Sequence, residues 1–206
     1  MPLALSAADP RRPLLRLLDR FGEQCPGQAQ ATRQFRAFAL EHADCFERTC
    51  IPGHFTGSAW LVDGRGRRVL LTHHRKLERW LQLGGHADGD GDLARVALRE
   101  AGEESGLADL VVEPEIFDLD RHVIPARGGE PEHWHYDVRF VVRATGEEAF
   151  VVGDESHALA WRDITGIAAD AMADESLRRM AREWLQYRQD DFYSAFRRKP
   201  ESSPAR

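Results

Sequence analysis

Three glutamates in one short stretch of the chain are the side chains best suited to chemistry. Glu100, Glu103 and Glu104 are spaced i, i+3 and i+4, so a helix places their carboxylates together on one side. Carboxylates at this spacing repel one another unless a cation compensates their charge. Ligand sets made only of oxygen suit Mg²⁺ or Mn²⁺, which take water or phosphate oxygens in their remaining positions. The spacing alone is more often that of a solvated charged helix face, and it is the surrounding residues that favour a divalent-cation site.

Acidic charge is concentrated around these glutamates. The 206-residue chain carries a formal net charge of −6, and residues 85–107 hold six acidic side chains against two basic ones. Such a concentration attracts a metal ion. The net charge also argues against nucleic acid as a partner, because proteins that bind nucleic acid usually present a basic surface.

The composition sets the class of protein. Hydrophobic residues make up 42% of the chain, which is enough for one ordinary domain with a buried core. The sequence has no run of about 20 apolar residues that could span a bilayer, and no basic segment before its short apolar start. Its three cysteines include no Cys-x-x-Cys pair, which argues against a disulfide framework or a thiolate zinc site. We therefore expect a cytoplasmic protein without a membrane partner.

A helix over residues 93–105 is expected to carry the three glutamates. Asp92 suits its N-cap, and Gly106 suits the position just after its end. Before this helix, alternating apolar residues predict a hairpin of strands at 57–62 and 68–72. The other predicted elements are helices at 13–21, 32–48 and 175–188 and strands at 80–83, 111–119, 136–143 and around 151–161. Helices interleaved with strands predict an α/β fold with a mixed sheet covered by helices.

The stretch from residue 85 to residue 107 resembles the signature of the Nudix hydrolase superfamily. That signature is Gly-x5-Glu-x7-Arg-Glu-U-x-Glu-Glu-x-Gly-U, where U is a bulky aliphatic residue. The matching positions are Gly85, Arg99, Glu100, Ala101, Glu103, Glu104, Gly106 and Leu107, of which Ala101 is small for its class. So many matches at fixed spacing make the resemblance specific.

One position departs from the signature. The family's early Glu falls at Gly91, which lies between Asp90 and Asp92. In the family that Glu supports the signature's Arg. Either one of the two aspartates therefore supports Arg99 with a one-residue shift, or Arg99 is anchored differently.

The resemblance implies an α/β/α sandwich with a mixed β-sheet, to which this chain adds N-terminal helices. It implies an enzyme, a pyrophosphohydrolase that cleaves a phosphoanhydride bond in a nucleoside diphosphate linked to another moiety. Sugar nucleotides, ADP-ribose and nucleoside triphosphates fit that description. The cofactor would be Mg²⁺ or Mn²⁺, which lowers the pKa of the attacking water. The implied metal ligands are Glu100, Glu103, Glu104 and Gly85, and the implied catalytic residues are Glu103, Glu100 and Arg99.

Histidines gather near the signature and in the loop after it, and nine are many for a chain of this length. His133 and His135 are two residues apart, so on a strand both rings point to one face, a workable metal geometry. We expect substrate contacts from His73, Arg75, Lys76, His86, His133 and His135. Two alternatives stay open, a second metal site and a set of solvated polar residues.

Two other functions fit part of the pattern. A nucleotide-sensing module on the same fold would bind without turnover, and only the altered position at Gly91 favours it. Isopentenyl-diphosphate isomerases share this fold and use histidines with glutamates for a metal, although no cysteine nucleophile stands beside such a set here. An isomerase would convert an isoprenoid diphosphate without releasing phosphate.

Three regions are expected along the chain. Residues 1–50 form a helical extension packed on the core, which covers an edge of the sheet or a homodimer interface. Residues 51–196 form the Nudix-like catalytic domain, and the polar residues 197–206 form a disordered tail.

Overall fold

The computed structural model describes residues 5–75, 77–153 and 156–197, with side chains described as far as residue 188. Its helices are α1 (Arg11–Gln24), α2 (Ala29–Glu41), α3 (Leu93–Ser105), α4 (Ile164–Ala169) and α5 (Glu175–Arg197), with a 3-10 turn at Pro26–Gln28. Its strands are β1 (Gly53–Val62), β2 (Arg68–His74), β3 (Arg79–Leu81), β4 (Leu83–His86), β5 (Leu110–Ile124), β6 (His133–Ala144) and β7 (Ser156–Asp163). In the described part of the chain, no helix is long and apolar enough to cross a membrane.

The strands form one mixed sheet around β1. The order is β3-β2-β1-β6-β5, with β4 paired to β1 and β7 paired to β2. β1 and β6 run parallel, whereas the other pairs are antiparallel. Every residue of β1 is buried, because this strand has neighbours along both edges and helices over both faces. The predicted mixed sheet is confirmed.

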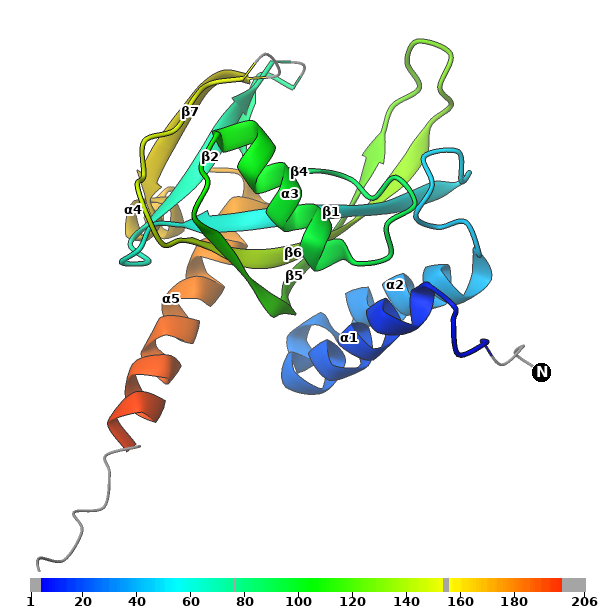
Figure 1. Ribbon diagram of the computed structural model, residues 1–206, viewed down its shortest axis with the longest axis horizontal. Helices are drawn as coiled ribbons and strands as arrows, with labels where there is room; N and C mark the ends of the chain where they lie inside the picture. Colours follow the sequence, from blue (N-terminus) through cyan, green and yellow to red (C-terminus); the bar gives the residue numbers. More distant parts are fainter. Residues whose placement is uncertain (1–4, 76, 154–155, 198–206) are drawn as a thin grey trace, which may run out of the picture.

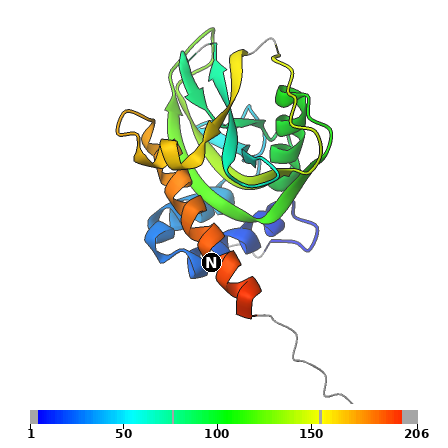
Figure 2. The same ribbon diagram turned by 90° about the vertical axis from the view of Figure 1, so that its left-hand side faces the viewer.

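Helices cover the two faces of the sheet, as Figures 1 and 2 show. One core joins α1, α2 and α3 to the sheet through side chains such as Phe35 and Phe55. The other joins α4 and α5 to the opposite face, where Trp60 and Trp184 are fully buried. This arrangement is the expected α/β/α sandwich with N-terminal helices.

Helix α3 forms where the sequence predicts it. The Asp92 side chain accepts a hydrogen bond from the Arg95 N–H, and Gly106 adopts the left-handed conformation with φ 71°. The helix lies directly on β1 at Gly57, where a Cβ would come within 2.8 Å of the Leu93 carbonyl oxygen. These contacts fix the position and the rotation of α3 over the sheet.

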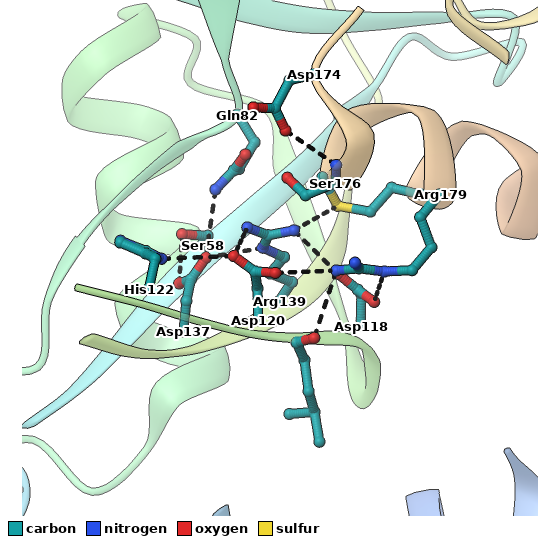
Figure 3. Close-up of polar contacts among 12 residues, drawn as sticks. Ser58, Gln82, Asp118, Asp120, His122, Asp137, Arg139, Asp174, Ser176 and Arg179 are labelled. Carbon is teal, nitrogen blue, oxygen red and sulfur yellow. Dashed lines mark hydrogen bonds and ion pairs between the residues drawn. The ribbon is translucent and has the colours of Figure 1, made fainter. Parts of the chain in front are cut away.

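A buried arginine ties the strands together on the face away from α3. Arg139, whose side chain is 2% exposed, makes ion pairs with Asp118 at 3.0 Å, Asp137 at 2.8 Å and Asp120 at 3.2 Å. Burial disfavours its charge, but the three carboxylates raise the pKa of Arg139. Ser58 of β1 donates a hydrogen bond to Asp137 (Figure 3). Thr56 donates a second one, and together they draw the central strand into the same network.

Helix α5 completes this network with one cation and one acid. Arg179 pairs with Asp118 at 2.7 Å and with Asp120 at 3.2 Å. Glu183 accepts a hydrogen bond from the Gln28 amide, but its second oxygen is buried with no hydrogen-bond partner in the part of the chain that the structure describes. Burial is the main cause that raises the pKa of Glu183 from 4.5 to about 7, and the nearby Asp118 adds to it. Protonation of the Glu183 carboxyl therefore stabilises the folded protein.

The N-terminal segment meets the loop before α3 at Gly91. A Cβ at Gly91 would lie 2.6 Å from the Pro10 carbonyl oxygen and 3.2 Å from the Phe46 ring. Pro10 and Phe46 both belong to the N-terminal extension. A side chain at position 91 is therefore incompatible with the way this extension packs.

Several predicted boundaries were wrong, two of them because of contacts between distant segments. Helix α2 ends at Glu41 rather than continuing to Arg48, since the Cys45 carbonyl accepts a hydrogen bond from the Phe55 N–H of β1. The predicted strand 80–83 is two strands, because β3 pairs with β2 while β4 pairs with β1. Helix α4 was not predicted, and β7 does not include Val151. The predicted disordered tail lies outside the described residues apart from Arg197, where α5 ends.

We expect Gly91→Ala to lower the free energy of unfolding by about 1 to 3 kcal/mol, the usual cost of overpacking. The added Cβ would collide with the Pro10 backbone, which is not a flexible side-chain end. Urea denaturation measures the change. Gly27→Ala is the matched control, because nothing lies within 4 Å of a Cβ at that position. Equal stability of the two variants would contradict the packing of Pro10 on Gly91.

We expect Glu183→Gln to change the pH dependence of stability. A carboxyl whose folded-state pKa is raised to about 7 stabilises the fold fully below its usual value of 4.5, and this stabilisation disappears as the pH rises through 7. Glutamine is neutral at every pH and keeps an oxygen for Gln28. The variant should therefore be about 1 to 2 kcal/mol more stable than wild type at pH 8 and equally stable near pH 4.5. Urea denaturation at both pH values checks this, and parallel stability curves would contradict it.

Candidate active site

The last two turns of α3 bring two of the three glutamates to β4. The Gly84 N–H donates a hydrogen bond of 2.8 Å to the Glu104 carboxylate. Gly85 lies so close to Glu100 that a Cβ there would overlap the Glu100 carboxylate. Glu103 lies on the exposed side of the helix. Two of the carboxylates thus pack on the β4 backbone, and the third faces solvent.

Neither Asp90 nor Asp92 anchors Arg99. Its Nη2 donates to the Glu100 carboxylate at 2.7 Å and to the His86 carbonyl oxygen at 3.0 Å. Asp90 instead pairs with Arg95 at 2.6 Å, and Asp92 caps α3. Arg99 therefore holds Glu100 against β4 without an acidic partner from the preceding loop.

The surroundings of Glu100 oppose its ionisation in the absence of a cation. Its side chain is 17% exposed, and burial is the largest cause of a raised pKa, against which the Arg99 guanidinium acts. A cation beside a half-buried carboxylate favours the charged form. Glu100, Glu104 and the adjacent backbone at Gly85 could hold a divalent cation through oxygen ligands, with Glu103 on the exposed side of the same helix.

Five histidines from four strands meet on the sheet face opposite α3. His54 of β1, His133 and His135 of β6 form the centre, with ring centroids 4.8 to 5.3 Å apart. His86 of β4 lies 5.1 Å from His54 and 5.0 Å from His135. His122 of β5 lies 5.5 Å from His135. We call these five residues the histidine cluster.

Two members of the histidine cluster, His54 and His135, have buried ring nitrogens without hydrogen-bond partners among the described residues. His54 is 2% exposed, and neither of its ring nitrogens has a hydrogen-bond partner among the described residues. The same holds for Nε2 of His135. Burial, together with the neighbouring imidazoles, lowers the pKa of His54 to about 4 and that of His135 to about 2. Both rings are therefore neutral at neutral pH and keep a nitrogen lone pair.

The other expected substrate contacts lie elsewhere. His73 is part of a cleft of about 530 Å³ between β2, β3 and the α4–α5 region, where Trp80 and Arg162 also line the wall. The Arg75 guanidinium donates to the Ser156 carbonyl oxygen at 2.9 Å. Lys76 lies outside the described residues. The structure thus brings His86, His133 and His135 together and separates them from His73 and Arg75.

The cysteines do not supply a reactive thiol to this region. All three are free. Burial raises the pKa of Cys45 to about 12 and that of Cys50 to about 11, and it also raises the pKa of Cys25. None of them is a thiolate near neutral pH, which disfavours chemistry that needs a cysteine.

Sequence reasoning selected His86, His133 and His135 but left His54 and His122 out of the expected contacts. The missing information was the strand register, since His54 pairs with His135 across β1 and β6, and His122 pairs with His135 across β5 and β6. The spacing Asp120-x-His122 was the available signal. Both of its residues lie within β5, which is longer than the predicted strand.

Comparison with known proteins identifies the fold. Residues 54–184 match the family model described as NUDIX domain. No curated protein matches the chain. Among solved structures, the chain is similar to a NUDIX-family hydrolase from Clostridium perfringens, with 24% identity and a TM-score of 0.51 over 65% of this chain and 97% of that one. It is also similar to a C. elegans Ap4A hydrolase in a binary complex, with 14% identity and a TM-score of 0.53 over 66% and 98%.

Proposed function

The chain belongs to the NUDIX domain family, and on this premise we propose that it is a Nudix-type pyrophosphohydrolase and propose its substrate class and cofactor. The substrate is a nucleoside diphosphate linked to another moiety, as in a sugar nucleotide, ADP-ribose or a nucleoside triphosphate. The cofactor is Mg²⁺ or Mn²⁺. The observation that carries the proposal is the approach of the β4 glycines to the carboxylates of α3.

The residues around β4 fit a divalent cation of this class. Glu100, Glu103 and Glu104 offer carboxylate oxygens, and Gly85 has no side chain to fill the space beside Glu100. Sets of oxygen ligands with room for water and phosphate oxygens are what Mg²⁺ and Mn²⁺ prefer. When bound, the ion neutralises the diphosphate and lowers the pKa of the attacking water.

Gly84, Arg99 and Glu103 have different roles in the proposed reaction. The Gly84 N–H holds the Glu104 carboxylate, and Arg99 holds the Glu100 carboxylate against β4. Glu103 is exposed and free to meet a water molecule, so we assign it the role of accepting the water's proton. Arg99 also adds positive charge close to where the diphosphate binds.

The first experiment is a hydrolysis panel. It covers nucleoside triphosphates, ADP-ribose, sugar nucleotides and dinucleoside polyphosphates, each with Mg²⁺ and with Mn²⁺. We expect wild type to cleave one of these classes only when the ion is present. Glu103→Gln and Glu104→Gln should each lower kcat by about 100-fold or more, the range for losing a general base or a charge-stabilising group.

Glu23→Gln serves as the matched control, because Glu23 is an exposed glutamate on α1 and should keep wild-type activity. Tight binding of a nucleotide without turnover would replace the proposal with a sensing module. Conversion of an isoprenoid diphosphate without phosphate release would replace it with an isomerase.

A second prediction uses the close contact at Gly85. The Cβ of Gly85→Ala would meet the end of the Glu100 side chain, which is flexible, so the carboxylate moves rather than the backbone. We expect the free energy of unfolding to stay within about 0.5 kcal/mol of wild type, while kcat in Mg²⁺ falls by about 100-fold. Urea denaturation and initial rates measure the two effects. Full activity in Gly85→Ala would show that the position of Glu100 against β4 is not needed for catalysis.

A further inference from the structure

We propose that His54, His133 and His135 bind one first-row transition-metal ion, of which Zn²⁺ is the representative, at a site separate from the α3 carboxylates. The ligand nitrogens of these three side chains lie within 4.8 Å of one another. Small rotations of the rings are enough to direct them at one ion. The site would join the start of β1 to the start of β6, two strands that pair in parallel.

Burial of unpaired nitrogen atoms is the main evidence for an ion. His54 is only 2% exposed, yet both its ring nitrogens lack a hydrogen-bond partner among the described residues. Nε2 of His135 is in the same condition. A buried polar atom without a partner costs about 1 to 3 kcal/mol, so three such atoms at one point need an explanation. An ion held by one nitrogen of His54 and one of His135 removes that cost for two of the three atoms.

A hydrogen bond to a nearby backbone carbonyl orients the third ligand, His133, for metal binding. Nδ1 of His133 donates a hydrogen bond of 2.9 Å to the Pro131 carbonyl oxygen. This contact fixes the tautomer that leaves Nε2 with a lone pair, and metal-binding histidines usually have such a partner on the second nitrogen.

The nitrogen ligands decide the class of ion. Imidazole suits Zn, Cu, Fe and Ni, whereas Mg²⁺ and Ca²⁺ take oxygen. Three protein ligands leave at least one position for water or for an oxygen of a bound anion. His86 and His122 border the three ligands, and His122 contacts Asp120 at 3.4 Å.

Two other groups of side chains have comparable spacing but lack buried, unpaired nitrogen atoms among the described residues. In the group of His73, Glu78 and His157, the His157 ring makes a 2.8 Å ion pair with the exposed Glu78. In the group of His42, Asp44 and Cys50, the thiol is hydrogen-bonded to Asp44, and the His42 ring packs on Phe38 at 4.7 Å. Neither group leaves a buried nitrogen unpaired among the described residues.

The test measures metal binding directly, with Co²⁺ and Zn²⁺ as probes and with millimolar Mg²⁺ present to occupy the carboxylate site. Purified, metal-stripped protein is titrated by calorimetry, and bound ions are counted by elemental analysis after dialysis. We expect one equivalent of Zn²⁺ and, with Co²⁺, the visible d–d absorption of a nitrogen-ligated ion. His54→Gln and His135→Gln should each weaken binding by about 100-fold or more.

Matched controls separate this site from the others. His157→Gln and His42→Gln each remove a histidine from one of the competing groups and should bind Zn²⁺ as wild type does. Glu103→Gln removes a carboxylate of the α3 site and should also leave Zn²⁺ binding unchanged. Because the readout is metal content, it stands whether or not the protein hydrolyses a diphosphate.

Three results would overturn the proposal. The first is that wild type retains no Zn²⁺. The second is that His54→Gln and His135→Gln still bind Zn²⁺ as wild type does. The third is that one of the control variants loses Zn²⁺ binding instead. If circular dichroism shows that His54→Gln does not fold, His133→Gln gives the answer, since His133 is only half-buried. Folded His133→Gln with wild-type affinity would reject the site.

Discussion

The end of the sheet that carries the histidine cluster depends on one constraint, the buried charge of Arg139. A guanidinium that is 2% exposed is stable only with its partners in place, and those partners come from β5, β6 and, through Arg179, α5. Asp120 pairs with Asp137 across β5 and β6, so the network fits a single register. A slip of one residue would turn every side chain to the other face and leave the charge unpaired.

The same register sets the histidine cluster. His122 lies two residues beyond Asp120, and His135 two residues before Asp137, so both rings are on the face that carries the Arg139 network. Thr56 brings β1 into that network, which places His54 opposite His135. The charge network thus aligns the strands, and the histidines meet because of that alignment.

Local patterns predicted the parts of the molecule that depend on local contacts. Helix α3 has the predicted bounds, because a helix is determined by residues close in sequence. The signals were its caps at Asp92 and Gly106 and the spacing of Glu100, Glu103 and Glu104. What the sequence could not provide was pairing between distant segments. His54 is 79 residues before His133, and only the parallel pairing of β1 with β6 brings them together. Likewise, the glycine at position 91 is explained by Pro10, from which it is separated by α1, α2 and β1.

Strand β4 connects the two candidate metal sites. Gly85 faces Glu100 under α3, and the next residue, His86, borders the histidine cluster while its carbonyl oxygen accepts a hydrogen bond from Arg99. The carboxylate site and the histidine cluster thus lie beside adjacent residues of one strand, but their ligands prefer different ions. Mg²⁺ and Mn²⁺ suit the oxygen ligands, whereas Zn²⁺ suits the imidazole nitrogens. Activity in Mg²⁺ or Mn²⁺ therefore tests the carboxylates, and the content of Zn²⁺ tests the histidines.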